Sequence, residues 1–462
     1  MMRAVTQKNS VLDAWIGKKI DIGMGTLTRE QLGLYQLQAM GDTIRRASNN
    51  SPFYRALLKD FVGTTMSSLA DLQRFPFTTA DHIRKQALQF LCVSQSDISR
   101  IVTLDSSGTT GKAKRIYFTP ADQELTIDFF EQGMSTIVEP GERVLILLPG
   151  ERSGSVGDLL LRALQTAGAI PLPHGVVENL AETLEIMVRE RIDSVVGIPV
   201  QVLALARYTE SSGKNIFLKN VLLSTDHVPN AINQELGRIW GCQVFEHYGM
   251  TEMGLGGGLD CVAHAGYHVR EADLYIEIIN DRGEAVPDGQ EGEVVFTTLT
   301  RQGMPLIRYR TGDISRFILG ACSCGTILRR LERITKRKND LVYLSEKQYF
   351  SMADLDERIF AVSGVVDYTA SVNCIQLATK LNVTVCLLHK PNQGTELALY
   401  EALNSVSVIQ QARQASKLSV IVKMSCMTDT LLPSPVKRRI VELKETNGNS
   451  KDLSSKAWGN RN

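Results

Sequence analysis

Apolar residues recur near the start of the chain with the period of an amphipathic helix. Between residues 28 and 49, the positions that follow this period are Leu32, Leu34, Leu37, Met40 and Ile44. This pattern predicts one long helix. Ser51 and Pro52 then predict the start of a second helix, because proline is favoured in the first helical turn. We therefore expect residues 1–100 to form a helical region of a larger N-terminal domain.

Short apolar runs alternate with helical stretches from residue 101 to about residue 285. The runs that predict buried strands are residues 101–104, 115–118, 144–148, 169–172, 194–198 and 221–224. Strands that alternate with helices are typical of an α/β domain with a mainly parallel sheet. We expect residues 101–338 to form this core, together with a β-rich subdomain at its end.

The pattern changes after residue 274. Apolar and polar residues alternate at 274–279 and at 292–297, which predicts two strands of the β-rich subdomain. A basic stretch at 336–340 predicts a linker, and residues 339–445 have the size and pattern of a small α+β domain. The polar tail, residues 446–462, is rich in Gly, Asn, Ser and Lys and is expected to be disordered.

Composition narrows the class of protein. The chain has 462 residues, too many for one ordinary core, and its formal net charge of +1 argues against a nucleic-acid or anionic-membrane partner. The first residues lack the apolar core of a signal peptide, and no apolar run is long enough for a membrane span. The eight cysteines are scattered apart from one close pair, so we expect a cytoplasmic protein without a disulfide framework.

The stretch between the predicted strands 101–104 and 115–118 carries the most distinctive chemistry. It reads Ser106-Ser107-Gly108-Thr109-Thr110-Gly111-Lys112. Glycines let backbone N–H groups converge on an anion, and hydroxyls and a lysine add further donors. The spacing differs from that of a Walker A loop. We expect a phosphate-binding loop, with a plain flexible loop as the alternative.

Further motifs accompany this loop in a characteristic order. They are Phe53-Tyr54-Arg55, Asp71-Leu72, Phe75-Pro76-Phe77-Thr78 and the span from Tyr248 to Asp340. With the loop they resemble the adenylate-forming superfamily, and most closely the phenylacetate–coenzyme A ligase family, over about Leu37 to Leu341. The resemblance implies an α/β adenylation domain and a small mobile C-terminal lid. It also implies a two-step reaction, in which a carboxylate and ATP give an acyl-adenylate and a thiol, usually coenzyme A, displaces AMP.

The resemblance also implies roles for single residues in an ATP site. Thr109 to Lys112 would hold the β- and γ-phosphates, Tyr248 would lie against adenine, Thr251 would bind the α-phosphate and Glu252 would hold magnesium. Asp313, in Tyr309-Arg310-Thr311-Gly312-Asp313, would accept both ribose hydroxyls. The residues expected to bind the nucleotide are Ser106, Ser107, Gly108, Thr109, Thr110, Gly111, Lys112, Ser224, Thr225, Asp226, His247, Tyr248, Gly249, Met250, Thr251, Glu252, Asp313 and Arg337.

The C-terminal part departs from the family pattern at two places. Asp340 would be the hinge of the lid, and Lys437 would act in catalysis with Thr251 and Glu252, although the glycine that usually precedes this lysine is Val436. Residues 343–348 lack the Arg-Gly that the family places after the hinge. An amine, a carrier thiol or a hydroxyl as acceptor therefore stays an alternative to coenzyme A, as does a nucleotide-binding regulator without turnover. A homodimer is what the family suggests.

A set of cysteines and histidines predicts a structural zinc site. Cys322 and Cys324 lie in a predicted turn, and Cys261 lies some sixty residues earlier beside His264 and His268. Two thiolates on one turn with a distant Cys/His pair is typical of a closed, four-coordinate zinc site. Relatives of the phenylacetate ligases that carry this set align their histidine with His268, and His264 is the alternative ligand.

The carboxylic acid is expected to bind beside the ends of several core strands. The expected neighbours are Pro149-Gly150, 197–199, His247 and the glycine-rich run 254–258. Small residues in that run are expected to leave room for a ring or a chain. The sequence leaves the identity of the acid open.

Overall fold

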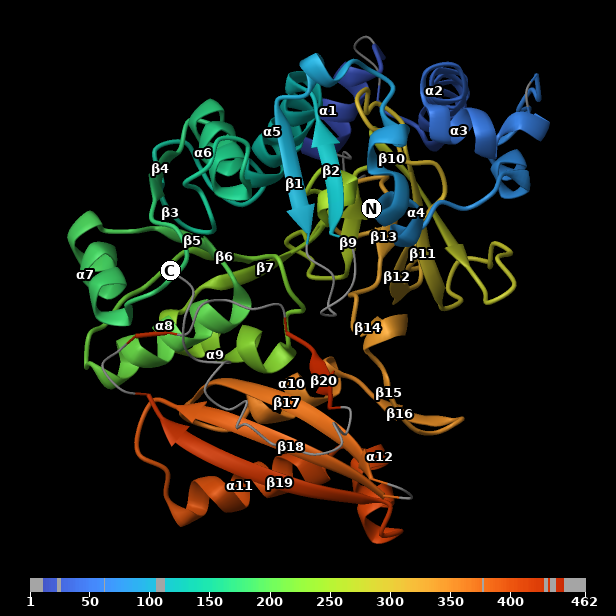
Figure 1. The fold of residues 1–462 in the computed structure, drawn as a ribbon. Helices are drawn as coiled ribbons and strands as arrows, with labels where there is room; N and C mark the ends of the chain where they lie inside the picture. The colour runs from blue at the N-terminus through green and yellow to red at the C-terminus, as the bar shows by residue number, and fades with distance from the viewer. Residues whose placement is uncertain are drawn as a thin grey trace, which may run out of the picture. The chain divides into compact units, whose positions relative to one another are not determined.

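The chain forms two compact units in a computed structural model that describes residues 11–22, 26–61, 63–104, 113–375, 378–427, 431–432 and 438–443. The first unit contains residues 1–175 and 245–338, and the second contains residues 176–244 and 339–462. Both units combine helices with strands (Figure 1), so the prediction of an α/β fold is confirmed.

The long helix at the start of the first unit is α2 (Arg29–Asn50). Thr28 caps it, because its side chain accepts a hydrogen bond from the amide of Gln31 while Gln31 reaches back to the amide of Thr28. Ser51 ends α2 and also caps α3 (Pro52–Leu57), whose first residue is the predicted proline. Both predicted helices are confirmed.

The buried face of α2 differs from the apolar pattern, since Leu34 is 63% exposed while Gln36 and Thr43 are buried. Gln36 Nε2 donates to the carbonyl oxygen of Glu271 at 2.8 Å, and Thr43 Oγ1 donates to that of Leu299 at 2.8 Å. A buried polar side chain is tolerated when it is hydrogen-bonded. The two polar residues therefore tie α2 to the chain on either side of the β-rich subdomain's first hairpin.

Other short helices and one antiparallel strand pair complete the N-terminal part. The remaining helical elements up to residue 99 are α1 (Val11–Lys19), η1 (Lys59–Phe61), η2 (Leu69–Arg74), α4 (Ala80–Gln86), η3 (Ala87–Phe90) and η4 (Gln95–Asp97). β1 (Arg100–Leu104) and β2 (Lys114–Phe118) run side by side in Figure 1. Their register ends at Leu104 opposite Lys114, so the two strands flank the predicted phosphate loop as a hairpin.

The α/β part of the first unit follows the predicted alternation. Its elements are α5 (Pro120–Met134), β3 (Arg143–Leu147), α6 (Val156–Thr166) and β4 (Ile170–Pro173). β3 and β4 are parallel neighbours, with α6 between them in the chain. Such a crossover is the usual connection of parallel strands, because the helix carries the chain back to the starting edge.

Antiparallel strands form the rest of the first unit. Four strands pair in sequence order: β7 (Gln243–Tyr248), β8 (Gly258–Leu259), β9 (Tyr267–Val269) and β13 (Arg330–Leu331). Only the last two residues of β7 pair with β8. β10 (Leu274–Ile279), β11 (Gly292–Thr298), β12 (Tyr309–Ser315) and β14 (Lys336–Arg337) form a four-stranded sheet. The predicted β-rich subdomain is thereby confirmed, and its sheet buries Ile276, Ile278, Val294 and Phe296.

The second unit combines a parallel strand pair with a four-stranded sheet. Its first elements are α7 (Leu180–Glu190), β5 (Ser194–Gly197), α8 (Pro199–Ser211), β6 (Asn220–Leu223) and α9 (Asn230–Trp240), with β5 and β6 parallel. Its later elements are η6 (Lys338–Asp340), β15 (Val342–Ser345), β16 (Gln348–Phe350), α10 (Met352–Ile359), β17 (Val365–Ile375), β18 (Ala378–Leu387), α11 (Gln393–Asn404), α12 (Ser407–Gln414), β19 (Leu418–Cys426) and β20 (Ile440–Glu442). The sheet has the order β19-β18-β17-β20, and with α10, α11 and α12 it gives this region the predicted α+β character.

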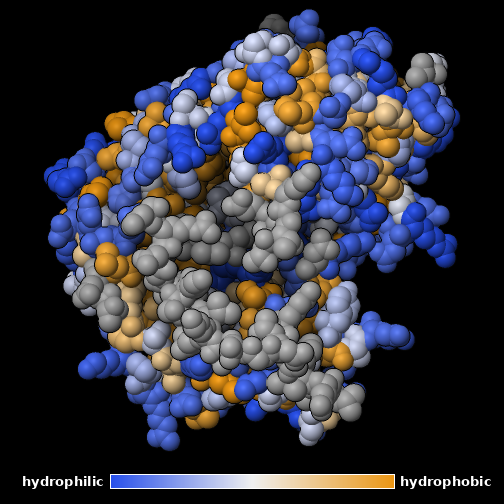
Figure 2. All heavy atoms as spheres, viewed as in Figure 1, coloured by the Kyte–Doolittle hydropathy of each residue, from blue (hydrophilic) through white to orange (hydrophobic). Residues whose placement is uncertain are grey.

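The surface is mixed in character. On the face drawn in Figure 2, hydrophilic residues surround small scattered apolar groups. Across the part of the chain that the structure describes, no helix combines the length and the apolar character that crossing a bilayer requires. The predicted tail, residues 446–462, lies outside the described residues.

Candidate functional site

The segment after β7 forms a tight turn that depends on glycine. A Cβ atom on Gly249 would lie 2.0 Å from the carbonyl oxygen of Leu255, and Gly254 has a φ of +75°. Only glycine meets both conditions without a clash or strain. The turn presents Thr251, half-buried, and Glu252, buried, in the short helix η5 (Thr251–Met253).

Glu252 lies between a cation and a hydroxyl group. Lys114 Nζ, on β2, forms an ion pair with Oε1 of Glu252, and Tyr309 Oη donates to the same oxygen at 3.0 Å. Arg301 holds the backbone of Glu252 by donating to its carbonyl oxygen at 2.8 Å. Burial alone would raise the pKa of the Glu252 carboxyl, but Lys114 and Tyr309 together keep it below its usual value. The carboxylate is thus held in its ionised form, as a hard cation requires.

Asp313 is the centre of a second cluster, to which three strands contribute. The Asp313 side chain is fully buried, and Tyr248 Oη donates to its Oδ2 at 2.9 Å. Arg337 Nε lies 2.7 Å from the other carboxylate oxygen. The ring of Tyr248 stacks on Tyr267, with 5.9 Å between ring centroids. The structure therefore brings Tyr248, Asp313 and Arg337 together.

The glycine run after η5 is packed rather than open. A Cβ on Gly256 would lie 2.4 Å from the ring of Phe129, and one on Gly257 would lie 2.6 Å from Met253 Sδ. His247 packs on the same aromatic group, with its ring edge-on to Phe130 at 5.8 Å. The expectation that these glycines leave room for a substrate is therefore wrong at these two positions. Gly256 permits close packing of α5 against the turn, and Gly257 permits the turn to pack on Met253 of η5.

The predicted residues 224–226 lie in the second unit, after β6. Ser224 is buried, and Thr225 is exposed with a φ of +79°. Burial raises the pKa of the Asp226 carboxyl, although the positive charge of Arg438 acts to lower it. Arg438 Nη2 also donates to Asp356 at 2.7 Å, and Nη1 pairs with Asp367. Arg438 is therefore a structural cation, although it directly follows the predicted catalytic lysine.

Several predicted residues lie outside the described residues. They are Ser106, Ser107, Gly108, Thr109, Thr110, Gly111, Lys112 and Lys437. Asp340, the predicted hinge, ends η6, and the boundary between the two units falls just before it, between Lys338 and Asn339.

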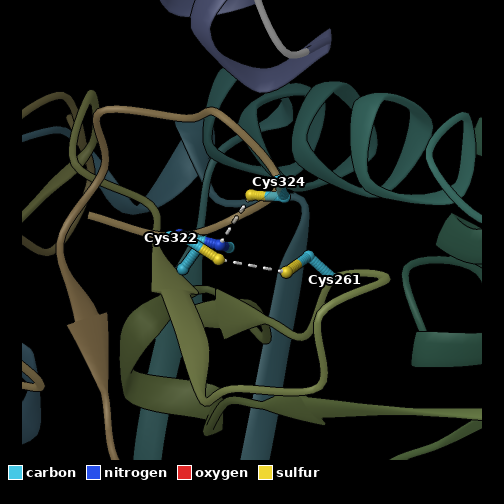
Figure 3. Close-up of side chains that lie close together, drawn as sticks. Cys261, Cys322 and Cys324 are labelled. Atoms are coloured by element: carbon cyan, nitrogen blue, oxygen red, sulfur yellow. Dashed lines mark hydrogen bonds between the residues drawn. The ribbon is translucent and has the colours of Figure 1, made fainter. Parts of the chain in front are cut away.

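Cys261, His268, Cys322 and Cys324 form a compact cluster in the first unit. Their ligand atoms all lie within 4.8 Å of one another. The Sγ atoms of Cys261 and Cys322 are 3.7 Å apart, and Cys324 Sγ is 3.3 Å from His268 Nε2 (Figure 3). A disulfide would need about 2.05 Å. Tetrahedral zinc with zinc–sulfur bonds of about 2.3 Å puts two sulfurs roughly 3.8 Å apart, which fits the cluster.

The local folds explain how the four ligands converge. His268 lies on β9 beside β8, and Cys261 follows β8 by two residues. The amide of Gly325 donates to the carbonyl oxygen of Cys322 at 3.1 Å and closes a turn that carries Cys322 and Cys324. Hydrogen bonds, chiefly with Cys261 and also with His268, lower the pKa of the Cys324 thiol well below its usual value.

His264, the alternative ligand, is not part of this cluster. Its Nδ1 lies 2.7 Å from Asp260 Oδ2, and its ring packs against Phe245 at 5.1 Å between centroids. Of the two histidines, the geometry favours His268 as the fourth ligand.

Two residues of the site were missed by sequence reasoning. Lys114 stands two positions after the predicted phosphate loop, and Arg301 lies between two sheet strands. Neither residue belongs to a sequence motif from which its contact with Glu252 could be predicted. A cation at the start of the strand after the loop was the one available signal for Lys114.

Known proteins resemble the chain in sequence. Residues 99–300 match the model of the AMP-binding enzyme family. The chain is 28% identical to phenylacetate-coenzyme A ligase of Thermus thermophilus over 69% of this chain and 73% of that protein. It is 27% identical to phenylacetate-coenzyme A ligase of Escherichia coli over 72% of this chain and 77% of that protein.

Solved structures share the fold. A 2-hydroxyisobutyryl-CoA ligase in the postadenylation state, in complex with R3-HIB-AMP, has a TM-score of 0.73 and 19% identity over 88% of this chain and 89% of its own. An anthranilate CoA ligase in complex with anthranoyl-AMP has a TM-score of 0.52 and 16% identity over 73% of this chain and 65% of its own. At these identities the likeness establishes the fold.

Proposed function

Because the chain is a phenylacetate–coenzyme A ligase-like adenylate-forming enzyme, we propose that it is an ATP-dependent, AMP-forming ligase. It would convert a carboxylic acid to an acyl-adenylate with release of pyrophosphate and then to a coenzyme A thioester. The names of the two sequence relatives favour an arylacetic acid as the substrate class.

One structural observation carries this proposal. Tyr248 and Glu252 from the turn after β7 lie in the same unit as Asp313 of β12 and Arg337 of β14, and direct contacts join Tyr248, Asp313 and Arg337. Glu252 is linked to the strand that carries Asp313, because the hydroxyl of Tyr309, on the same strand, donates a hydrogen bond to Glu252. The polar groups that a nucleotide's ribose and phosphates need are thereby gathered from distant segments.

The proposed roles follow from the chemistry of each side chain. Asp313 would accept ribose hydroxyls, Tyr248 would border the adenine, and Thr251 would donate to the α-phosphate. Glu252 would bind magnesium, which neutralises phosphate charge when bound. The loop 106–112 would hold the outer phosphates, and Lys437 would donate to the α-phosphate or the attacking carboxylate.

The C-terminal region would complete the reaction. Residues 339–445 would move as a lid about Asp340 between the two steps, with Arg337 leaving Asp313 to contact phosphate. The unit boundary beside Asp340 supports a hinge at this position. By the family resemblance, Ser224, Thr225 and Asp226 would contact the nucleotide, and His247, Gly249 and Met250 would shape its pocket.

A zinc ion would cross-link the β-rich part of the first unit by binding Cys261, His268, Cys322 and Cys324. The spacing of the sulfur and nitrogen atoms supports this assignment. The ion would be structural, because four protein ligands leave no position for a substrate. A cytoplasmic location is part of the proposal, and a reducing compartment would suit the free thiols of Cys92, Cys242, Cys386 and Cys426. A homodimer is compatible with these roles and is testable by light scattering.

A second acceptor class is favoured by one observation. β15 and β16 form a hairpin whose connecting residues are Glu346 and Lys347, within the stretch 343–348 that lacks the family's Arg-Gly. An altered loop near the thioester site would suit an amine, a carrier thiol or a hydroxyl as acceptor.

Pyrophosphate release tests the proposed function. The protein is incubated with ATP, magnesium and a panel of aryl, arylacetic and short-chain acids, with and without coenzyme A. Release that depends on one acid, with a thioester formed only when coenzyme A is present, is the expected result. Release without thioester would favour the second acceptor class. ATP binding without release from any acid would favour a nucleotide-binding regulator.

A further inference from the structure

The carboxylate proposed to hold magnesium already has a cation of its own. Lys114 Nζ pairs with Glu252 Oε1 inside the first unit. The side chains of Lys114 and Glu252 are 15% and 5% exposed, so water screens the pair little. Among the described residues, the other side chain bonded to this carboxylate is neutral Tyr309. Lys114 is therefore the countercharge that makes burial of Glu252 tolerable.

Arg301 does not take over this role, although it lies nearby. Its guanidinium donates to the backbone carbonyls of Glu252 and Tyr117 at 2.8 and 2.9 Å, and it stacks over Phe118 at 4.4 Å. Arg301 thus fixes the backbone, and Lys114 neutralises the side chain.

A divalent ion and an ammonium group cannot both bind this carboxylate favourably. Glu252 supplies one negative charge, so the pair with Lys114 is neutral, and adding magnesium would place unbalanced positive charge in a buried site. Phosphates of a bound nucleotide would change this balance by supplying several negative charges. Lys114, near the phosphate loop in the chain, would then have an alternative partner.

We propose that Lys114 and the magnesium ion of the nucleotide are alternative counter-cations of Glu252. Lys114 neutralises the carboxylate when no nucleotide is bound, and the ion replaces it when the magnesium nucleotide binds. This inference rests on the proposed function of Glu252. Its consequence is that Lys114 lowers the benefit that magnesium brings to ATP binding and keeps the empty site neutral.

The test compares ATP affinity with and without magnesium. Isothermal titration calorimetry of the full chain measures the dissociation constant of ATP in EDTA and in excess magnesium. The magnesium benefit is the constant in EDTA divided by the constant in magnesium. In Lys114→Met the freed carboxylate takes the ion without displacing a lysine, so this ratio should rise about tenfold above that of the unaltered protein. Lys114→Arg keeps the charge and should restore the original ratio.

Lys19 offers a matched control. It lies in the same unit, its side chain is 17% exposed, and it pairs with Asp273, whose side chain is 4% exposed, at 2.8 Å. Lys19→Met therefore removes a comparably buried lysine whose partners, Asp128 and Asp273, are not among the proposed nucleotide-binding residues, and should leave the ratio unchanged. Glu252→Gln should abolish the magnesium benefit. If Lys114→Met does not fold, Lys114→Gln replaces it.

The outcomes separate this inference from the proposed function. An equal or smaller ratio in Lys114→Met would overturn the exchange of cations. ATP binding without pyrophosphate release from any acid would overturn the ligase function, while the ratio would still decide the role of Lys114. Absence of ATP binding would overturn both.

Discussion

At the scale of single residues, Asp313 has the geometry that the proposed ribose site needs. Its two oxygens are occupied by Tyr248 and Arg337, and its side chain has no exposed surface. A ligand hydroxyl that replaces Arg337 would meet an already oriented acceptor. Preorganised acceptors of this kind contribute to binding because little reordering is needed.

Asp313→Asn should therefore weaken ATP binding more than it weakens the fold. The amide keeps the shape but loses the charge and one acceptor, so we expect the KM for ATP to rise by about tenfold or more. Steady-state pyrophosphate release against ATP concentration measures this. Asp281→Asn removes an exposed partner of Lys338 and is the control expected to leave KM unchanged. Equal KM values for both variants would contradict the role of Asp313.

His247 makes a second prediction at this scale. Burial, together with the charge of Arg270, lowers its pKa to about 4. The unfolded chain binds a proton at this histidine near pH 6.5, so the folded state loses relative stability as the pH falls from about 6.5 to about 4. The loss should total roughly 3 kcal/mol, and His247→Gln should remove it. Denaturant unfolding at several pH values measures the difference, and parallel curves for both proteins would contradict the assignment.

At the scale of elements, α8 is tied to the C-terminal part of its own unit by one arginine. Arg207 is 4% exposed and pairs with Glu235 at 3.1 Å. Its guanidinium also donates to the carbonyl oxygens of Phe360 and Val362 at 2.8 and 3.1 Å, and to that of Val365. The end of α10 and the start of β17 therefore depend on a single side chain from α8.

Arg207→Met should lower the free energy of unfolding by about 3 kcal/mol, because buried carbonyls and Glu235 lose their donor. Arg238 is the matched control, since it also pairs with Glu235 but is 53% exposed. Arg238→Met should cost less than about 1 kcal/mol. Urea unfolding of both variants checks the difference, and similar losses would show that burial does not set the strength of these contacts.

The turn that carries Cys322 and Cys324 gives a second prediction at this scale. Cys324→Ser should remove stoichiometric zinc and lower Tm by roughly 5–10 °C, since a four-coordinate site loses a ligand. Elemental analysis and thermal unfolding measure both effects. Cys92→Ser changes a cysteine of the same unit outside the cluster and should alter neither. A wild-type protein purified without zinc would refute the metal site.

At the scale of the whole molecule, the sequence predicted element types better than packing. The helices at 29–50 and 52–57 and the strands of the β-rich subdomain followed from local pattern, because period and capping are local properties. The Cys/His cluster followed from ligand chemistry. Gly256 was misjudged because its neighbour Phe129 is far away in the chain.

Lys114 was missed for the same reason, since its partner Glu252 is 138 residues away. The division into units also required the structure, because residues 176–244 join the C-terminal part rather than the strands that precede them in the chain. Long-range pairing depends on the complete fold, and no local pattern encodes it.

Transfer of an oxygen atom from the acid to AMP tests the central claim most directly. The acid identified by pyrophosphate release is labelled with ¹⁸O in its carboxylate and incubated with ATP, magnesium and coenzyme A. If the carboxylate attacks the α-phosphate, AMP recovered by mass spectrometry carries one ¹⁸O atom, and pyrophosphate carries none. Unlabelled AMP, or ¹⁸O in released phosphate together with ADP, would contradict an acyl-adenylate and with it the proposed function.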